Sequence, residues 1–273
     1  DLSTGAITNI IEYTTATGYT QFSNLTLSSQ DKVILNNCLF IVNSNGGANS
    51  KGTVLKIDLS TNVTTVLADI NTLTGNSEPY TKGHSFVYNG KYYALYGDKL
   101  GVYDGATGNY TELQNGFAAD QRVYDSVLVG NTLYFQGIYF VLGVLNLDNL
   151  NFQQYTPPSF SFSYGVAFIF FDSVNNKVFQ KSHSNTAIDM FAYDIGASTY
   201  GVDNTHKGFI STSSQGFLNH NNELYYAAAA PSQSTAVLYG MYKYNFTTKT
   251  ETLLVNLDNS AFVPDGVNFL DVN

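Results

Sequence analysis

The sequence predicts an all-β fold, a β-propeller of six blades whose last blade is split between the N- and C-termini. Three observations lead to this prediction. Short strand patterns recur along the 273 residues, strong hairpin signals separate them, and the composition is that of strands and turns. Aromatic residues make up 15% of the chain and charged residues only 12%, and the periodic Ala, Leu, Glu and Lys pattern of helices is missing.

The clearest repeat unit covers residues 82–114 and reads as four antiparallel strands. An apolar strand at 84–88 is followed by Asn89-Gly90, the strongest short hairpin signal, and by an aromatic strand at 91–97. A third strand ends at Asp104, where a turn rich in residues that tolerate positive φ begins. The fourth strand alternates and is more polar, which is typical of an outer edge strand.

The unit recurs along the chain. Each third strand ends in an acidic or amide turn residue, and successive turn residues lie 46, 44, 46 and 51 residues apart. A period in the forties with four short strands per unit is typical of propeller blades. The turn residues are Asp58, Asp104, Asp148, Asp194 and Asn245. The predicted blades of this single domain, residues 1–273, are 20–70, 82–115, 122–156, 163–203, 209–256, and 261–273 together with 1–14.

Strands can be placed in the remaining blades in the same way. Inner strands are continuously apolar and outer strands alternate, as expected for a sheet packed between two neighbours. The first blade has predicted strands at 32–36, 38–43, 53–58 and 63–69, and the third at 123–130, 131–137, 140–148 and 152–156. Those of the fourth blade are 164–173, 177–182, 190–194 and 199–202, and those of the fifth are 215–219, 223–230, 237–245 and 250–256.

The two ends of the chain together predict the sixth blade. Residues 1–5, DLSTG, match the turn at 58–62, DLSTN, so the residues after them read as an outer strand. Residues 266–273 read as an innermost strand and its turn. No residues remain for both of the strands between them. Either this blade is short, or another molecule supplies the missing strands by β-augmentation, which makes assembly with other protein chains, copies of itself included, a serious hypothesis.

The third-strand ending φ-x-φ-D-x-x-T-G (φ apolar) resembles that of the broad superfamily of kelch-like and YncE-like β-propellers. The resemblance covers nearly the whole chain and implies the architecture alone. The kelch pattern requires a Gly-Gly doublet and a Trp, and the units of this sequence have neither at the expected place, since Gly46-Gly47 lies in a predicted loop. No function is therefore carried over from that superfamily.

Charge and motifs argue against several classes of function. The net charge is −9 and Arg122 is the single arginine, which argues against a nucleic-acid partner and against an anionic membrane surface. No apolar run approaches the length of a bilayer span, so no membrane insertion is predicted. The four histidines have no metal-ligand spacing, and there is no Walker loop or G-x-S-x-G elbow. The sequence predicts no catalytic residue, no metal site and no cofactor.

One polar surface is predicted at the mouth of the propeller, where loops lead into the innermost strands. Acids, a guanidinium and imidazoles around one opening suit a polar ligand or an oxygen-liganded cation, although polar loops are common to all propeller mouths. Two of the carboxylates, if roughly 5–10 Å apart, would suit a carbohydrate-active enzyme. The ligand-binding candidates are His84, Asp125, Tyr164, Gln215 and Asp265, with Arg122 and His206 just before the entry positions.

Four sequons for N-linked glycosylation, all with Thr at the third position, begin at Asn24, Asn62, Asn109 and Asn245. Three of them fall in the same predicted turn of the repeat, where an exposed loop would accept a glycan. Their placement predicts an extracellular protein, secreted or held at the cell surface.

Three functions remain open at this stage. The first is a glycosylated structural or interaction propeller that assembles through its incomplete terminal blade, and the sequence favours it because no catalytic motif is present. The second is a lectin-like module that binds carbohydrate. The third is a carbohydrate-active enzyme that uses carboxylates at the mouth. Strand tyrosines are expected to pack between blades and not to stack on sugars.

Overall fold

The computed structural model describes residues 32–43, 52–70, 84–96, 98–117, 123, 125–137, 141–157, 167–182, 190–206, 215–220, 222–229 and 239–256. These residues form twenty β-strands in five four-stranded antiparallel sheets, which confirms the predicted all-β class. In this part of the chain no helix is long and apolar enough to cross a membrane. Residues 1–14 and 261–273, the predicted sixth blade, lie outside the described residues.

Each sheet is built from four consecutive strands, and we name the sheets blade 1 to blade 5. Blade 1 contains β1 (Lys32–Leu35), β2 (Cys38–Asn43), β3 (Thr53–Asp58) and β4 (Thr64–Asp69). Blade 2 contains β5 (His84–Tyr88), β6 (Lys91–Tyr96), β7 (Lys99–Asp104) and β8 (Tyr110–Gln114). Blade 3 contains β9 (Asp125–Val129), β10 (Thr132–Gln136), β11 (Leu142–Asn146) and β12 (Phe152–Tyr155). Blade 4 contains β13 (Ala167–Asp172), β14 (Lys177–Ser182), β15 (Phe191–Asp194) and β16 (Thr199–Val202). Blade 5 contains β17 (Gln215–His220), β18 (Glu223–Ala229), β19 (Tyr239–Asn245) and β20 (Thr250–Asn256).

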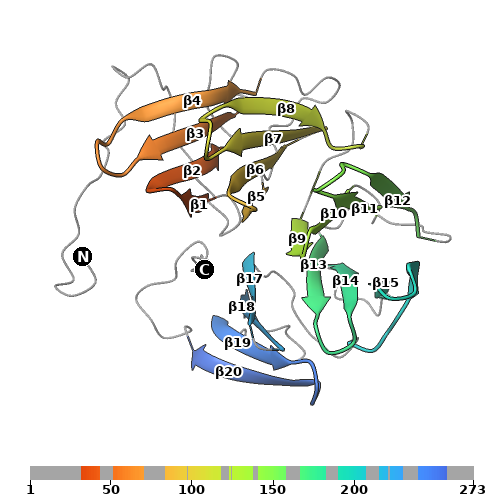
Figure 1. Ribbon diagram of the computed structural model, residues 1–273. Helices are drawn as coiled ribbons and strands as arrows, with labels where there is room; N and C mark the ends of the chain where they lie inside the picture. Colours follow the sequence, from red (N-terminus) through yellow and green to blue (C-terminus); the bar gives the residue numbers. More distant parts are fainter. Residues whose placement is uncertain are drawn as a thin grey trace.

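Figure 1 shows the five blades set around a common centre, with β1, β5, β9, β13 and β17 innermost. Each innermost strand contacts that of the next blade along the chain, β1 with β5, β5 with β9, β9 with β13 and β13 with β17. This radial arrangement of four-stranded antiparallel sheets is that of a β-propeller.

One recurrent loop joins the third strand of a blade to the fourth. In blade 2, Oδ1 of Asp104 accepts hydrogen bonds from the backbone N–H groups of Ala106 (2.9 Å) and Thr107 (3.1 Å). Four residues after Asp104, Gly108 takes a φ of 75°. The same offset pairs a side-chain acceptor with a residue of positive φ in the other blades: Asp58 with Asn62, Asn146 with Leu150, Asp194 with Ser198, and Asn245 with Lys249. The periodic acidic or amide residue is therefore needed because its side chain closes this loop.

The predicted turn residue of blade 3, Asp148, is wrong by two positions. Strand β11 ends at Asn146, whose Oδ1 accepts the N–H groups of Asp148 (2.9 Å) and Asn149 (3.2 Å). The carboxylate of Asp148 instead accepts hydrogen bonds from Asn131 Nδ2 (2.6 Å) and from the hydroxyl of Tyr88 in blade 2 (2.9 Å). Both residue types carry a suitable acceptor oxygen, so the repeat spacing alone did not distinguish them.

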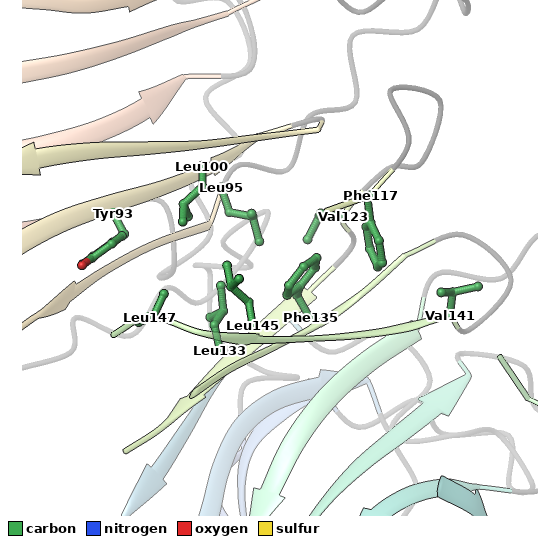
Figure 2. Close-up of a cluster of buried hydrophobic side chains, with 10 residues drawn as sticks. All are labelled: Tyr93, Leu95, Leu100, Phe117, Val123, Leu133, Phe135, Val141, Leu145 and Leu147. Atoms are coloured by element: carbon green, nitrogen blue, oxygen red, sulfur yellow. The ribbon is translucent and has the colours of Figure 1, made fainter. Parts of the chain in front are cut away.

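The hydrophobic core lies between neighbouring blades. Between blades 2 and 3, aliphatic and aromatic side chains from both sheets converge, and Figure 2 shows them facing one another. This cluster contains Tyr93, Leu95, Leu100, Phe117, Val123, Leu133, Phe135, Val141, Leu145 and Leu147. Comparable clusters fill the spaces between blades 1 and 2, around Phe40 and Tyr92, and between blades 3 and 4, around Tyr134 and Ile169. A fourth lies between blades 4 and 5, around Phe170 and Tyr226.

Candidate functional site

The predicted mouth residues include the first residue of three innermost strands. His84 begins β5, Asp125 begins β9 and Gln215 begins β17. Because the innermost strands of a propeller run in the same direction along its axis, these three positions lie at one end of the fold. Three further predicted residues, Arg122, Tyr164 and Asp265, lie outside the described residues.

Asp125 joins two blades. It is buried, its Oδ1 accepts the N–H of Ser126 (2.9 Å), and its Oδ2 accepts the N–H of Ile169 on β13 (2.9 Å). Both carboxylate oxygens thus hold backbone groups, one of them in the neighbouring blade. A carboxylate fixed in this way stabilises the contact between blades 3 and 4 at the mouth end of their innermost strands.

His206 does not lie at an open mouth but between blades 4 and 5. It is 1% exposed and packs edge-on against the rings of Phe170, Phe179 and Phe246. Its Nε2 lies 2.8 Å from Oδ2 of Asp172, and its Nδ1 lies 2.9 Å from the hydroxyl of Tyr244.

The hydrogen-bonded group of Asp172, His206 and Tyr244 links three segments of the chain. Asp172, at the end of β13, also accepts the N–H groups of Val174 (2.9 Å) and Asn175 (3.1 Å) and the side-chain amide of Asn175 (2.6 Å). Burial opposes the charge on Asp172, but the hydrogen bonds from His206 and Asn175 outweigh it and leave the pKa of this carboxyl below its usual range. Burial, with the nearby Asp172 charge, raises the pKa of Tyr244 to about 12.

An ionised Asp172 fixes the arrangement of protons. His206 Nε2–H donates to the carboxylate, and in the neutral imidazole Nδ1 then accepts the hydroxyl of Tyr244. Every polar atom of the ring has a partner, so this arrangement stabilises the fold. The sequence gives one local signal for it, a histidine shortly after a fourth strand, but not the burial.

The segment that carries His206 is anchored at its start. Asp203 accepts a hydrogen bond from Lys177 Nζ at 2.8 Å, and its backbone N–H donates to the carbonyl of Met190. Asn204 Oδ1 accepts the N–H of Met190 at 3.1 Å. Burial opposes the charge of Asp203, but Lys177 and Thr205 outweigh it and lower its pKa to about 2.

The sequon asparagines differ in their surroundings. Asn62 and Asn109 lie exposed in the loops between the third and fourth strands of blades 1 and 2. Asn245 is half-buried, because its Oδ1 closes the loop of blade 5 and its Nδ2 donates to Oε1 of Glu223 (3.2 Å). Asn24 lies outside the described residues. The same loop therefore presents two asparagine side chains to solvent and uses the third for its own structure.

Strand tyrosines pack between blades, as expected. Tyr92 and Tyr226 are fully buried, and Tyr92 shares a hydrogen bond with Ser85 (3.1 Å). Tyr96 and Tyr226 each lie on the second strand of a blade and donate to a glutamate on the outer strand, Glu112 and Glu251 respectively. These tyrosines therefore stabilise the outer strands on their sheets, and their buried rings are not available to stack on a sugar.

The outer strand of blade 5 exposes three consecutive apolar residues, whereas β4 and β16 each expose one, Val66 and Val202. Residues 253–255 of β20, Leu-Leu-Val, are 39–45% exposed. Strand β8 exposes Thr111-Glu112 and β12 exposes Gln153-Gln154. Strand β4 has a register shift like that of β20, so this irregularity does not distinguish the two. Within the five described sheets, no strand pairs with the outer edge of β20.

The described residues contain no group of three or more His, Cys, Asp or Glu side chains arranged to hold a metal ion. The chemistry visible in this part of the chain is that of fixed hydrogen bonds between blades, exposed loop asparagines and one apolar outer strand.

No protein-family model matches the sequence, and no curated protein matches it significantly. Solved structures match the fold. A Bacteroides thetaiotaomicron protein of unknown function is 12% identical with a TM-score of 0.51, over 86% of this chain and 60% of its own. Sqt1 of Saccharomyces cerevisiae is 12% identical with a TM-score of 0.50, over 80% of this chain and 58% of its own. A chain of a nidogen/laminin complex is 10% identical with a TM-score of 0.48, over 81% of this chain and 76% of its own.

The chain thus spans about 60% of the length of the first two of these proteins. At this level of identity the likeness shows the fold alone, and that fold is the β-propeller. The resemblance to propellers in general is confirmed, without any narrower family.

Proposed function

We propose that the protein is a secreted or cell-surface, N-glycosylated β-propeller that acts as an interaction module and associates with further copies of itself. The observation that carries this proposal is the apolar outer strand β20, where residues 253–255 are exposed. An exposed edge strand with apolar side chains favours pairing with another strand, and β20 exposes three consecutive apolar residues where β4 and β16 each expose one, Val66 and Val202.

The sequence of β20 favours a second copy as its partner. Antiparallel pairing of two β20 strands centred on Leu253 sets Glu251 of one copy against Val255 of the other. No two carboxylates then face each other, whereas parallel in-register pairing would oppose Glu251 with itself. Such a contact is isologous and closes as a dimer.

The exposure of Asn62 and Asn109 supports the glycosylated, extracellular part of the proposal, because a glycan needs an exposed loop. Asp125 weighs against an enzyme at the mouth. A glycosidase needs two carboxylates directed at its substrate, and this one holds two backbone N–H groups.

Association is tested by light scattering over a range of concentrations. We expect particles of at least twice the monomer mass for the wild type, whose polypeptide is 29.9 kDa. We expect monomers for Leu254→Lys, since a lysine on an edge strand opposes pairing. Thr111→Lys, on the outer strand of blade 2, is the matched control and should behave as the wild type. A monomeric wild type would overturn self-association, and oligomers that survive Leu254→Lys would exclude β20 as the interface.

Glycosylation is tested separately, by peptide mass spectrometry of protein secreted from a eukaryotic host. Occupied Asn62 and Asn109 would support the proposal, and unmodified peptides at both positions would contradict its extracellular part.

A lectin-like function is the second candidate. It is supported by the placement of His84 and Gln215 at the same end of two innermost strands. A glycan-binding screen tests it with His84→Ala as the variant. Binding that this variant weakens would support a carbohydrate site at the mouth, and the absence of any binding by the wild type would exclude one.

A further inference from the structure

Two buried side-chain amides between blades 3 and 4 have an unpaired atom. Oε1 of Gln136 and Nε2 of Gln180 have no hydrogen-bond partner within the described part of the chain, and the two residues are 1% and 0% exposed. Leaving a buried amide group without a hydrogen bond costs free energy, so each such group in a folded protein needs a physical explanation.

Backbone register places the two glutamines beside the same contact. Gln136 on β10 lies directly opposite Asp125 on β9, and Gln180 on β14 lies directly opposite Ile169 on β13. Asp125 Oδ2 accepts the N–H of Ile169 across the two blades. The four residues therefore form one continuous row, with a glutamine at each end and the inter-blade hydrogen bond in the middle.

Both glutamines face the space between these blades. Side chains alternate along a strand, so Gln136 points to the same side as Tyr134, and Gln180 to the same side as Val178. Tyr134 and Val178 belong to one buried cluster, which fills the interface of blades 3 and 4. The hydroxyl of Tyr200 donates to Oε1 of Gln180 at 2.5 Å, which leaves Nε2 of that amide as the unpaired donor.

The two unpaired atoms are chemically complementary. Gln136 offers an acceptor and Gln180 offers a donor. We infer that a buried water molecule, or a short chain of two, bridges Gln136 Oε1 and Gln180 Nε2 beside the Asp125–Ile169 hydrogen bond. A water accepts from Nε2–H and donates to Oε1, and buried waters of this kind normally make two to four such bonds.

Other small species fit less well. A cation would satisfy the oxygen of Gln136 but not the N–H of Gln180, and an anion would satisfy the N–H but not the oxygen. An apolar molecule would satisfy neither. The site thus holds a molecule that both donates and accepts, and its role is to join blades 3 and 4 next to the mouth. This inference is independent of the proposed function.

A crystal structure of the full chain at high resolution tests the inference directly. We expect electron density for a water within about 2.7–3.2 Å of Gln136 Oε1 and Gln180 Nε2, or for two waters that connect them. Three results would overturn it: a direct hydrogen bond between the two amides, protein partners for both atoms, or a metal ion or larger ligand in the site.

A double-mutant cycle gives a second test in solution. Methionine resembles glutamine in length and shape but forms no such hydrogen bonds. If one water joins the two amides, the effects of Gln136→Met and Gln180→Met should be coupled. The folding equilibrium constant of the double variant should then be roughly fivefold higher than the value obtained by multiplying the two single reductions. Effects that multiply without coupling would overturn the bridge. Gln154→Met, at an exposed position of β12, is the matched control and should leave the unfolding midpoint in urea unchanged.

Discussion

The interface between blades 2 and 3 and the interface between blades 4 and 5 solve the same packing problem with different chemistry. The first is filled by aliphatic and aromatic side chains, with Phe135 in contact with Phe117 at a centroid distance of 4.7 Å. The second also buries aromatic rings, but these surround a histidine that is hydrogen-bonded to Asp172 and Tyr244. The first interface is held mainly by burial, with a hydrogen bond from Tyr88 to the carboxylate of Asp148 at its exposed rim, and the second combines burial with a buried carboxylate.

This difference has consequences for what each interface specifies. Apolar packing is strong but has little directionality, so the shape of the side chains mainly fixes the position of blades 2 and 3. Gly143 shows how tight that shape is, because an added Cβ would lie 2.6 Å from Cζ of Phe135. The bonds of His206 point in fixed directions and tie β13, β19 and the segment after β16 into one register. The polar interface buries the carboxyl of Asp172, whose pKa is lowered, so its stability should fall in acid, whereas the buried cluster between blades 2 and 3 contains no carboxyl group.

The largest expected effect is at the apolar interface. Phe135 is fully buried, so Phe135→Ala removes a large ring and leaves a cavity, which should lower the free energy of unfolding by about 3–5 kcal/mol. Urea denaturation measures the change. Gln154→Ala, at an exposed position of β12, is the control and should stay within about 0.5 kcal/mol of the wild type. A decrease in the free energy of unfolding of less than about 1 kcal/mol for Phe135→Ala would mean that packing at this interface contributes little to stability.

A somewhat smaller effect is expected at the polar interface. Asp172→Ala leaves His206 and two backbone N–H groups without their acceptor, which should cost about 3 kcal/mol in the same urea experiment. Asp58→Ala is a matched control, since Asp58 also accepts two backbone N–H groups but contacts no histidine. We expect about 1 kcal/mol there. Equal losses in both variants would show that the contact with His206 adds nothing.

Much of the fold could be predicted from the sequence because the blades repeat. Alternation, Asn89-Gly90 and the residue that closes each third-strand loop are local signals, and the structure uses each of them. The error at Asp148 has the same origin, since Asn146 closes the loop equally well and lies only two residues away. Local chemistry thus predicts the type of loop, but it does not show which of two residues, two positions apart, closes it.

The candidate site was less predictable because it depends on contacts between blades. Asp125 begins the innermost strand β9, two residues after the predicted start at 123, but the sequence does not show that its carboxylate bonds to Ile169, 44 residues away. His206 likewise reads as a loop residue near the mouth, and only the packing of Phe170, Phe179 and Phe246 around it shows that it is buried. Loop chemistry is local, whereas burial is set by the neighbouring blade.

The smallest expected effect is a dependence of stability on pH that comes from blade 4. The folded-state pKa of Asp203 is about 2, below its ordinary value of 3.8, and that of Asp172 is also lowered. A carboxyl with a lowered pKa stabilises the fold fully above its unfolded pKa, and this stability is lost as the pH falls through the folded pKa. The hydrogen bond to Asp203 raises the pKa of Lys177, so the contribution of the lysine is lost only at alkaline pH.

We therefore expect the wild type to lose stability between about pH 4 and pH 2, measured as the urea midpoint at a series of pH values. Asp203→Asn should lower the midpoint at neutral pH and reduce its fall in acid, because the amide does not titrate. Phe135→Ala should lower the whole curve without changing its shape, since no titrating group is removed from the apolar interface. If the urea midpoint of Asp203→Asn fell in acid as steeply as that of the wild type, the ion pair with Lys177 would not contribute, and the pH dependence would rest on Asp172.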